Sequence, residues 1–246
     1  MMLSGKRVLI TGGGTGLGAD LARGFSLAGA EVVIAGRKPE ALQMVVAKYP
    51  RVRAIEADVM REDDVKKLFE TAGSIDIVIA NAGAADSAPF SRTTLEQWNA
   101  MLAVNLTGVF LTFREGLAQM KGWGRLISIA SIAGLNGYPY VAAYTAAKHG
   151  VVGLTKSLAL ELTKKPITVN AICPGYLDTE MTDRTISNIV QKTGRSREQA
   201  LEDLLIAAQQ KRLIAPSEVT AKALSLCAQS SDSVNGEAIA MPDGEA

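Results

Sequence analysis

The chain has 246 residues, 48% of them hydrophobic, with 26 basic and 25 acidic side chains. The length suits one large α/β domain or two small ones, and the balanced charge argues against nucleic acid or an anionic membrane as a partner. Because no apolar run reaches the roughly 18 residues of a membrane span and no signal peptide precedes the first strand pattern, we expect a soluble, cytoplasmic protein.

Short β-rich runs alternate with longer helical stretches along the whole chain. Strands are predicted at 7–11, 31–36, 51–58, 75–81, 124–131, 167–175 and 237–241. Helices are predicted at 17–29, 39–48, 61–72, 94–121, 143–164 and 217–228. Strands rich in Ile and Val suit a parallel sheet buried on both faces, and the alternation predicts a doubly wound α/β sheet of about seven strands. With no linker or composition break, we expect a single domain over residues 1–246.

Residues 176–213 interrupt this alternation, since they carry no strand signal. Ser196 and Gln199 have the spacing of a capping box. An apolar stripe at helical spacing follows it, formed by Leu201, Leu204, Leu205 and Ala208. The segment follows the carboxyl end of a strand, where such folds bind ligands. We therefore expect residues 176–213 to form a helical lid over the substrate.

The stretch "TGGGTGLG", residues 11–18, lies between a strand and a helix. In that setting backbone N–H groups and the helix N-terminus receive a phosphate, although glycines in a turn often serve steric needs only. The stretch lacks the Gly-Lys-Ser/Thr ending of a triphosphate-binding loop. We predict that a dinucleotide pyrophosphate binds here, in contact with Gly12, Gly14, Thr15, Gly16 and Leu17.

The second strand ends in "AGRK", residues 35–38, where an NAD site usually has an acidic residue for the adenosine ribose. Gly36 and Arg37 stand there instead, with Lys38 beside them. An arginine at this place accommodates a 2′-phosphate. The alternative is that both basic side chains decorate an exposed turn. We predict a preference for NADP(H) over NAD.

Proton transfer is predicted to fall to Tyr144. Tyr144 and Lys148 are four residues apart, so on a helix they share a face, and an ammonium nearby favours the phenolate. Ser131 ends the preceding strand, where its hydroxyl can hold a substrate oxygen. Taken singly, Tyr144 could be a packing residue and Lys148 a solvated charge. His149 is the only histidine, and Cys173 and Cys227 form no metal-binding pattern, so we expect no metal site.

Taken together, these motifs resemble the short-chain dehydrogenase/reductase family over essentially the whole chain. In order along the chain they are "TGGGTGLG", "ADV" at 57–59, "NAG" at 81–83, "VNL" at 104–106, Ser131, "YTAAK" at 144–148 and "PGYLDT" at 174–179. The resemblance implies a Rossmann-like fold and reversible hydride transfer between a nicotinamide cofactor and a small-molecule ketone or secondary alcohol, with Tyr144 as general acid/base. One departure is Glu245 near the C-terminus, where the family often has glycine.

The resemblance also implies roles for the matching residues. Asn105, Ser131, Tyr144 and Lys148 would be catalytic, with Asn105 holding a proton relay behind Lys148. Asp58 and Val59 would contact the adenine. Further cofactor contacts would come from Asn81, Ala82, Gly83, Tyr144, Lys148, Pro174, Gly175 and Thr179. Family members are commonly homotetramers or homodimers built through the helices at 94–121 and 143–164, so an oligomer is expected.

The substrate stays open between several alternatives. The C-terminal half resembles 3-oxoacyl-thioester (CoA or acyl-carrier-protein) reductases and 3-hydroxybutyrate dehydrogenases, but Ala84, Ala85 and Ala133 stand where the latter place carboxylate-binding side chains. A basic lid would suit a carrier phosphate or be solvated surface; its side chains are Arg184, Lys192, Arg195 and Arg197. A pocket for a bulkier ketone would be lined by Tyr138, Tyr140, Tyr176 and Met181. A non-catalytic cofactor-sensing scaffold and a lyase or dehalogenase are disfavoured because Ser131, Tyr144 and Lys148 are all present.

Overall fold

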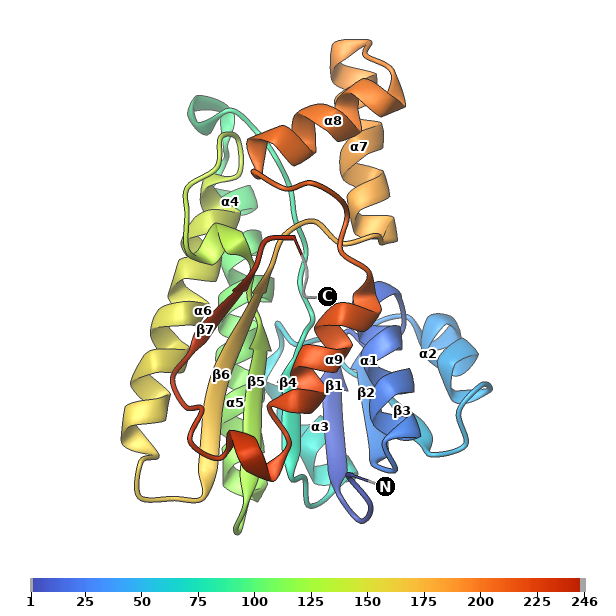
Figure 1. The fold of residues 1–246 in the computed structure, drawn as a ribbon, viewed down its shortest axis with the longest axis vertical. Helices are drawn as coiled ribbons and strands as arrows, with labels where there is room; N and C mark the ends of the chain where they lie inside the picture. The colour runs from blue at the N-terminus through green and yellow to red at the C-terminus, as the bar shows by residue number, and fades with distance from the viewer. Residues whose placement is uncertain (1, 244–246) are drawn as a thin grey trace.

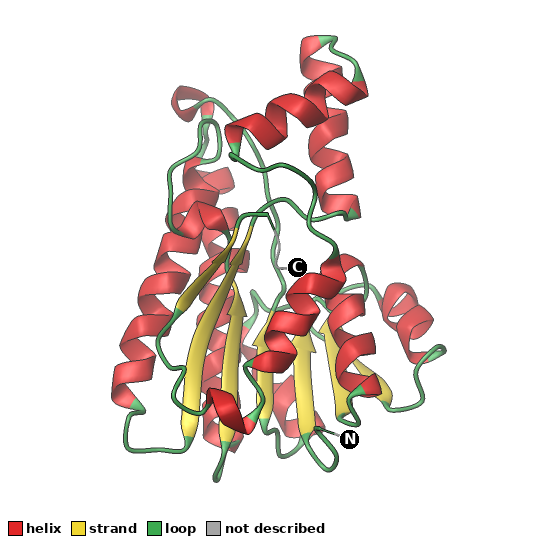
Figure 2. Cartoon of the chain, viewed as in Figure 1, coloured by secondary structure: helices red, strands yellow, loops and turns green. Residues whose placement is uncertain are grey.

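The computed structural model describes residues 2–243 and contains a seven-stranded parallel sheet (Figures 1 and 2). The strands follow one another across the sheet in the order β3-β2-β1-β4-β5-β6-β7. Their bounds are β1 Arg7–Thr11, β2 Glu31–Gly36, β3 Val52–Glu56, β4 Ile77–Ala80, β5 Gly124–Ile129, β6 Ile167–Pro174 and β7 Ala238–Met241. The doubly wound sheet predicted from the sequence is confirmed, and Glu245 lies outside the described residues.

Helices cover both faces of the sheet. Their bounds are α1 Gly16–Leu27, α2 Pro39–Val46, α3 Glu62–Ala72, α4 Leu95–Leu102, α5 Gly108–Gln119, α6 Ala142–Glu161, α7 Glu180–Thr193, α8 Arg197–Ala207 and α9 Pro216–Ser225. Side chains alternate across β1, so Val8 and Ile10 pack with Phe25 of α1, while Leu9 packs with Phe69 of α3 on the other face. Burial on both faces explains the continuous apolar strands. None of the helices among residues 2–243 is long and apolar enough to cross a membrane.

The helix predicted at 94–121 differs from the expected single α-helix. It consists of α4, a π-helical turn at Ala103–Thr107, and α5. A π-turn inserts one extra residue into a helical turn and is frequent at functional sites. The insertion changes no residue type, and for this reason the sequence pattern does not reveal it. Asn105 lies fully buried within this turn.

Residues 176–213 form a separate pair of helices, α7 and α8, above the carboxyl ends of the strands (Figure 1). The capping box at the start of α8 is present, with Ser196 Oγ accepting from the Gln199 N–H and the Gln199 side chain accepting from the Ser196 N–H. Of the predicted apolar stripe, Leu204 and Ala208 are buried. The chain reversal between α7 and α8 passes through Gly194 in the left-handed conformation, with φ of 72°.

Candidate active site

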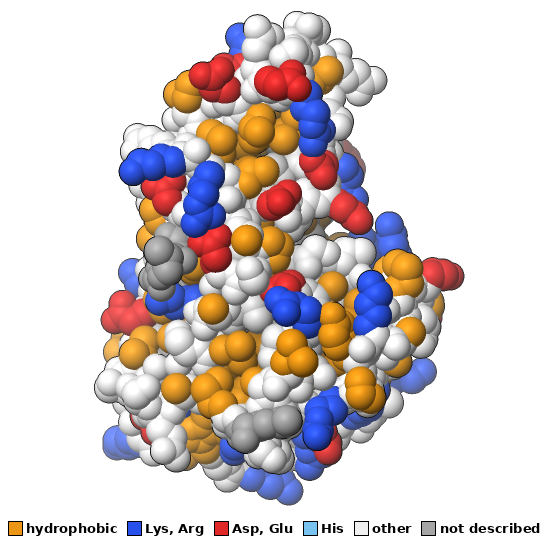
Figure 3. All heavy atoms as spheres, turned by 45° about the vertical axis from the view of Figure 1, so that its right-hand side comes forward, with side chains coloured by type: hydrophobic (Ala, Val, Ile, Leu, Met, Phe, Trp, Pro, Cys, Tyr) orange, Lys and Arg blue, Asp and Glu red, His pale blue; other side chains and the backbone are white. Residues whose placement is uncertain are grey.

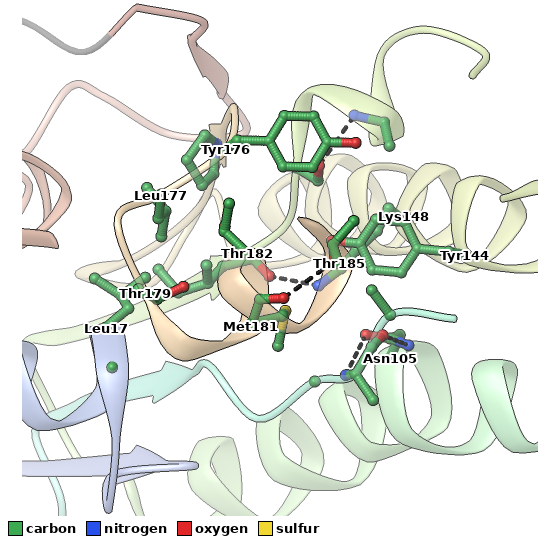
Figure 4. A pocket seen from close by; sticks show the side chains of 18 of the residues that line it. Leu17, Asn105, Tyr144, Lys148, Tyr176, Leu177, Thr179, Met181, Thr182 and Thr185 are labelled. Carbon is green, nitrogen blue, oxygen red and sulfur yellow. Dashed lines mark hydrogen bonds between the residues drawn. The ribbon is translucent and has the colours of Figure 1, made fainter. Parts of the chain in front are cut away.

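A cavity of about 340 Å³ opens at the carboxyl ends of the central strands, beneath α7 (Figure 4). Parallel strands present their carboxyl ends at the same edge, where such folds bind ligands. The cavity brings together most residues predicted from the sequence to form the site. These are Gly12, Thr15, Gly16, Leu17, Asn81, Ala82, Gly83, Asn105, Ser131, Tyr144, Lys148, Pro174, Gly175 and Thr179. The other predicted residues, which do not line it, are Gly14, Arg37, Lys38, Asp58 and Val59.

The glycine loop leaves a backbone cradle at the start of α1. Gly12 has φ of 67°, and a Cβ there would lie 2.9 Å from the Ala82 Cα. A Cβ at Gly18 would lie 2.0 Å from the Gly12 carbonyl oxygen, so only glycine lets α1 approach the loop this closely. The N-cap residue Thr15 makes no side-chain capping bond, which leaves N–H groups of the first helical turn available. This cradle fits a pyrophosphate.

Gly14 belongs to the packing beneath this cradle. A Cβ added there would lie 3.2 Å from the Ala41 side chain and 3.3 Å from the Leu42 nitrogen of α2. The missing side chain of Gly14 therefore lets α2 approach the loop, and its predicted contact with the cofactor stays a prediction.

Thr11 joins the loop to the end of β4. Its Oγ1 accepts hydrogen bonds from the backbone N–H groups of Asn81 and Ala82, both at 3.1 Å. The Asn81 side chain in turn donates to the Thr11 carbonyl at 2.9 Å. These bonds fix two edges of the cavity against each other. Sequence reasoning missed this hydroxyl contact, because the pattern marks Thr11 only as the end of a strand.

The end of β2 carries the predicted specificity residues. Arg37 is 64% exposed, and its guanidinium lies 3.9 Å from an Asp58 carboxylate oxygen. Gly36 adds no carboxylate at this edge. Val59 packs under α5, within 2.9 Å of the position of a Cβ at Gly108. An exposed arginine thus follows the carboxyl end of β2, beside the glycine loop, and its ion pair with Asp58 is a weak surface pair.

Three side chains surround the reactive part of the cavity, Ser131 two residues after the end of β5 and Tyr144 and Lys148 of α6. The Tyr144 hydroxyl lies near Ser131, whose Oγ accepts from the Ala133 N–H at 3.1 Å. Lys148 is buried, and its Nζ donates to the Ile129 carbonyl at 2.8 Å. The spacing of four residues puts Tyr144 and Lys148 on the same helix face, with the ammonium 5.6 Å from the ring centroid. The predicted grouping of Ser131, Tyr144 and Lys148 is thus present.

The proton affinities of this group differ from the expectation that Lys148 lowers the pKa of Tyr144. Burial raises the pKa of Tyr144 to about 12, and the nearby Ser131 hydroxyl offsets only part of this. Burial lowers the pKa of Lys148 to about 8. In both cases the largest effect is burial, which disfavours the charged form. At neutral pH the phenol is therefore protonated and can donate a proton.

Asn105 connects the π-turn to the loop after β4. Its Nδ2 donates to the carbonyls of Ala84 at 2.9 Å and Met101 at 3.1 Å, and its Oδ1 accepts from the Ala84 N–H at 3.3 Å. A Cβ at Gly83 would lie 2.8 Å from Asn105 Oδ1 and 3.8 Å from Lys148 Nζ. The missing side chain at Gly83 thus leaves space where these two polar groups converge.

The remainder of the cavity lining combines polar side chains of α7 with apolar and aromatic ones. Figure 4 shows Met181, Thr182 and Thr185 of α7 lying across the cavity from Tyr144 and Lys148 of α6. The apolar and aromatic lining consists of Ala84, Ala85, Ala133, Tyr138, Val141, Tyr176, Leu177 and Met181. Tyr140, which the sequence grouped with this pocket, does not line it: its φ is 67° and its side chain is 66% exposed. The α7 residues Thr182, Thr185 and Asn188 were missed because the sequence signal located a helix only at α8.

The basic side chains of the α7–α8 segment are partly neutralised. Arg195 pairs with Asp203, and Arg197 pairs with Asp183. Lys192 donates to the Ser87 carbonyl at 3.5 Å. Figure 3 shows acidic and basic side chains interspersed over this part of the surface. Arg184 lines the cavity and, among residues 2–243, makes no ion pair.

Comparisons with known proteins agree with this geometry. The short chain dehydrogenase family profile matches residues 6–189. A D-beta-hydroxybutyrate dehydrogenase from Rhizobium meliloti (strain 1021) is 33% identical and the alignment covers 97% of this chain and 98% of the relative. A 3-oxoacyl-acyl-carrier-protein reductase, FabG, from Aquifex aeolicus (strain VF5) is 34% identical, with 98% of both chains covered.

Two solved structures of reductases also share this fold. A single-residue variant of actinorhodin polyketide ketoreductase, solved with NADPH, superposes with a TM-score of 0.90 at 30% identity, over 99% of this chain and 97% of that one. Levodione reductase superposes with a TM-score of 0.89 at 30% identity, over 97% and 96% of the two chains. The chain therefore belongs to the short chain dehydrogenase family and is an oxidoreductase of the kind that uses a nicotinamide cofactor.

Proposed function

We propose that the protein is an NADPH-dependent reductase of uncharged ketones that also runs in reverse on secondary alcohols, with Tyr144 as general acid/base. The observation that carries this proposal is that Ser131, Tyr144 and Lys148 line the same cavity as the glycine cradle. The arrangement supplies a proton donor, an oxygen-binding hydroxyl and a phosphate-receiving loop in one space.

The residues present fit a nicotinamide dinucleotide. The glycine cradle would hold the pyrophosphate. The far end of the dinucleotide would lie toward Pro174, Gly175 and Thr179, at the end of β6. When bound, the cofactor supplies or accepts the hydride.

The chain's own side chains handle the substrate oxygen and the proton. Ser131 Oγ would donate a hydrogen bond to the carbonyl oxygen and so polarise the carbonyl. Tyr144, protonated at neutral pH because burial raises its pKa to about 12, would deliver its proton to the same oxygen. Lys148 and Asn105 would then return a proton to the phenolate through the space beside Gly83. Tyr144→Phe should abolish turnover and leave NADPH binding nearly intact.

The proposed NADP(H) preference rests on Arg37. The side chain is exposed at the end of β2, and its ion pair with Asp58 is long enough to exchange for a phosphate. The ketoreductase that superposes with this chain was solved with NADPH. Arg37→Asp should invert the ratio of NADPH to NADH affinity. An unchanged ratio would show that another residue sets the preference.

The proposal of an uncharged ketone rests on the cavity wall. Ala84, Ala85 and Ala133 offer no partner to a carboxylate, so a charged group placed against this part of the wall would lack compensating groups. The α7–α8 segment would act as a lid that brings Tyr176 and Met181 over the substrate. Levodione reductase, which shares the fold at 30% identity, supports a ketone of this kind.

A second candidate is a 3-oxoacyl thioester as substrate. It is favoured by the 34% identity to the 3-oxoacyl-acyl-carrier-protein reductase. It is also favoured by Arg184, which lines the cavity without an ion pair among residues 2–243 and could meet a phosphate. Against it, Arg195 and Arg197 are engaged with carboxylates of the same segment.

The test is NADPH consumption by the purified protein, offered a neutral cyclic or aryl ketone and a 3-oxoacyl-CoA in parallel. Tyr144→Phe serves as the blank. A higher kcat/KM for the neutral ketone is expected. Faster turnover of the thioester would replace the first candidate by the second, and no turnover of either would refute both.

We also propose a homo-oligomer, a dimer or tetramer, in the cytoplasm. Leu95 of α4, Phe110 of α5 and Leu160 of α6 are large exposed apolar side chains on the helices that would form the contact. Cys173 and Cys227 are unpaired, as in a reducing compartment. Light scattering of the purified protein tests the assembly.

A further inference from the structure

The chain enters and leaves the α7–α8 segment at one place, directly beyond Pro174 and Gly175. The Ile214 N–H donates to the Tyr176 carbonyl at 3.0 Å, and the Asp178 N–H donates to the Ile214 carbonyl at 2.9 Å. Leu177 and Ile214 form an isolated parallel bridge. Backbone hydrogen bonds therefore join the stretch of chain that enters the α7–α8 segment to the stretch that leaves it.

Gln210 fills the space beneath this junction and uses every polar atom of its side chain. It is only 6% exposed. Its Oε1 accepts from the Tyr176 N–H at 2.8 Å, and its Nε2 donates to the carbonyls of Tyr176 at 2.8 Å and Arg212 at 2.5 Å. Both backbone polar groups of Tyr176 thus face one side-chain amide. A buried amide satisfied in this way holds its partners in one geometry.

The same amide lies against Gly175. A Cβ added to Gly175 would be 2.5 Å from Gln210 Oε1 and 2.8 Å from the Pro242 carbonyl oxygen. Gln209, the residue before Gln210, has φ of 54°, an uncommon conformation for any residue other than glycine. Gln209 makes the reversal after α8, and its exposed side chain contrasts with the buried one of Gln210.

We propose that Gln210 is a positioning residue: it fixes the Gly175–Tyr176 backbone and so sets the affinity for the nicotinamide half of the cofactor. The inference rests on the proposed function, in which that backbone meets the nicotinamide end of the dinucleotide. Gln210 itself touches no reacting atom. Gly175 and Tyr176 line the cavity, and Gln210 acts through them.

The experiment compares the binding of NADP⁺ with that of adenosine 2′,5′-bisphosphate, a fragment that lacks the nicotinamide. Gln210→Met keeps the size of the side chain and removes all three hydrogen bonds. We expect NADP⁺ to bind about tenfold more weakly to this variant, with fragment binding unchanged. A residue that merely supports the fold would weaken both ligands alike. The matched control is Gln191→Met, an exposed glutamine of α7 outside the cavity, which should change neither.

Equal weakening of both ligands, or no weakening of NADP⁺, would overturn the proposal. If Gln210→Met does not fold, Gln210→Asn carries the same expectation, because it keeps an uncharged amide that is one methylene too short to hold both backbone groups of Tyr176. Because the experiment measures binding and not turnover, it can refute the role of Gln210 without refuting the proposed reaction, and the reverse also holds. A wild-type protein that binds NADP⁺ and reduces no ketone would refute the proposed reaction and leave this comparison valid.

Discussion

Removing the charge of Lys148 should stabilise the cofactor-free protein at neutral pH and weaken the dependence of its stability on alkaline pH. Lys148 is only 4% exposed, and burial lowers its pKa from 10.5 to about 8. Below pH 8 the side chain is charged in both the folded and the unfolded chain, so the folded state bears the full desolvation cost. A shift of this size corresponds to about 3 kcal/mol.

The sign of the pH dependence follows from proton binding. Between pH 8 and pH 10.5 the unfolded chain holds a proton on Lys148 that the folded chain has released. Stability therefore rises with pH in that window, because the unfolded state binds more protons. From about pH 7 to about pH 9.5 the gain attributable to Lys148 is about 2 kcal/mol. Lys148→Met lacks this gain.

The assay is urea unfolding of the wild type and of Lys148→Met without cofactor, at several values between about pH 7 and about pH 9.5. Subtracting the two free energies of unfolding removes the other titrating groups. Across this range the free energy of unfolding of the wild type should rise by about 2 kcal/mol relative to that of the variant. The variant also lacks the hydrogen bond to the Ile129 carbonyl, but that loss is the same at every pH and does not affect the slope. A difference that stays constant or falls with pH would refute the argument that burial governs the Lys148 ammonium.

Two further predictions concern the glycine cradle and the buried Arg125 of β5. Gly18→Ala, whose Cβ would lie 2.0 Å from the Gly12 carbonyl oxygen, should abolish NADPH binding in a fluorescence titration, whereas Gly153→Ala, with nothing within 4 Å, should leave it intact. Arg125 is fully buried, donates to the carbonyls of Gly124 at 2.8 Å and Leu226 at 3.1 Å, and pairs with the exposed Asp232. Arg125→Leu should therefore lower the free energy of unfolding by about 2–4 kcal/mol in urea melts, and Asp232→Asn by less than about 1 kcal/mol; equal losses would contradict this.

The parts of the fold that follow from local chemistry were predictable from the sequence. The strands carry Ile and Val on both faces because both faces are buried, and this pattern predicted the parallel sheet. Gly18 is required by a close contact with the Gly12 carbonyl oxygen, within the same eight residues. Tyr144 and Lys148 share a face because of helical periodicity alone. In each case the cause acts over a few residues.

The parts that depend on distant contacts were not predictable. Gln210 meets Tyr176 across 34 positions of the chain, and nothing in its neighbourhood distinguishes it from Gln209. From the sequence, Arg197 could be interpreted as a cation available to a ligand, but in the fold it forms an ion pair with Asp183. Tyr140 shares an aromatic cluster with Tyr138 in the sequence, but its backbone turns into the left-handed region and points the ring outward.

The π-turn at Asn105 combines both kinds of cause and leads to a last prediction. The Asn105 side chain donates to the Met101 carbonyl, one turn earlier in the helix, and binds both backbone groups of Ala84. Asn105→Ala would leave these buried groups without their partner, at a cost of about 2–3 kcal/mol, and would release the loop that carries Gly83 beside Lys148. Urea unfolding and NADPH turnover should both decline, while Asn99→Ala on the exposed face of α4 should change neither. If Asn105→Ala keeps wild-type stability but loses turnover, the asparagine serves the proton path alone and the π-turn does not need it.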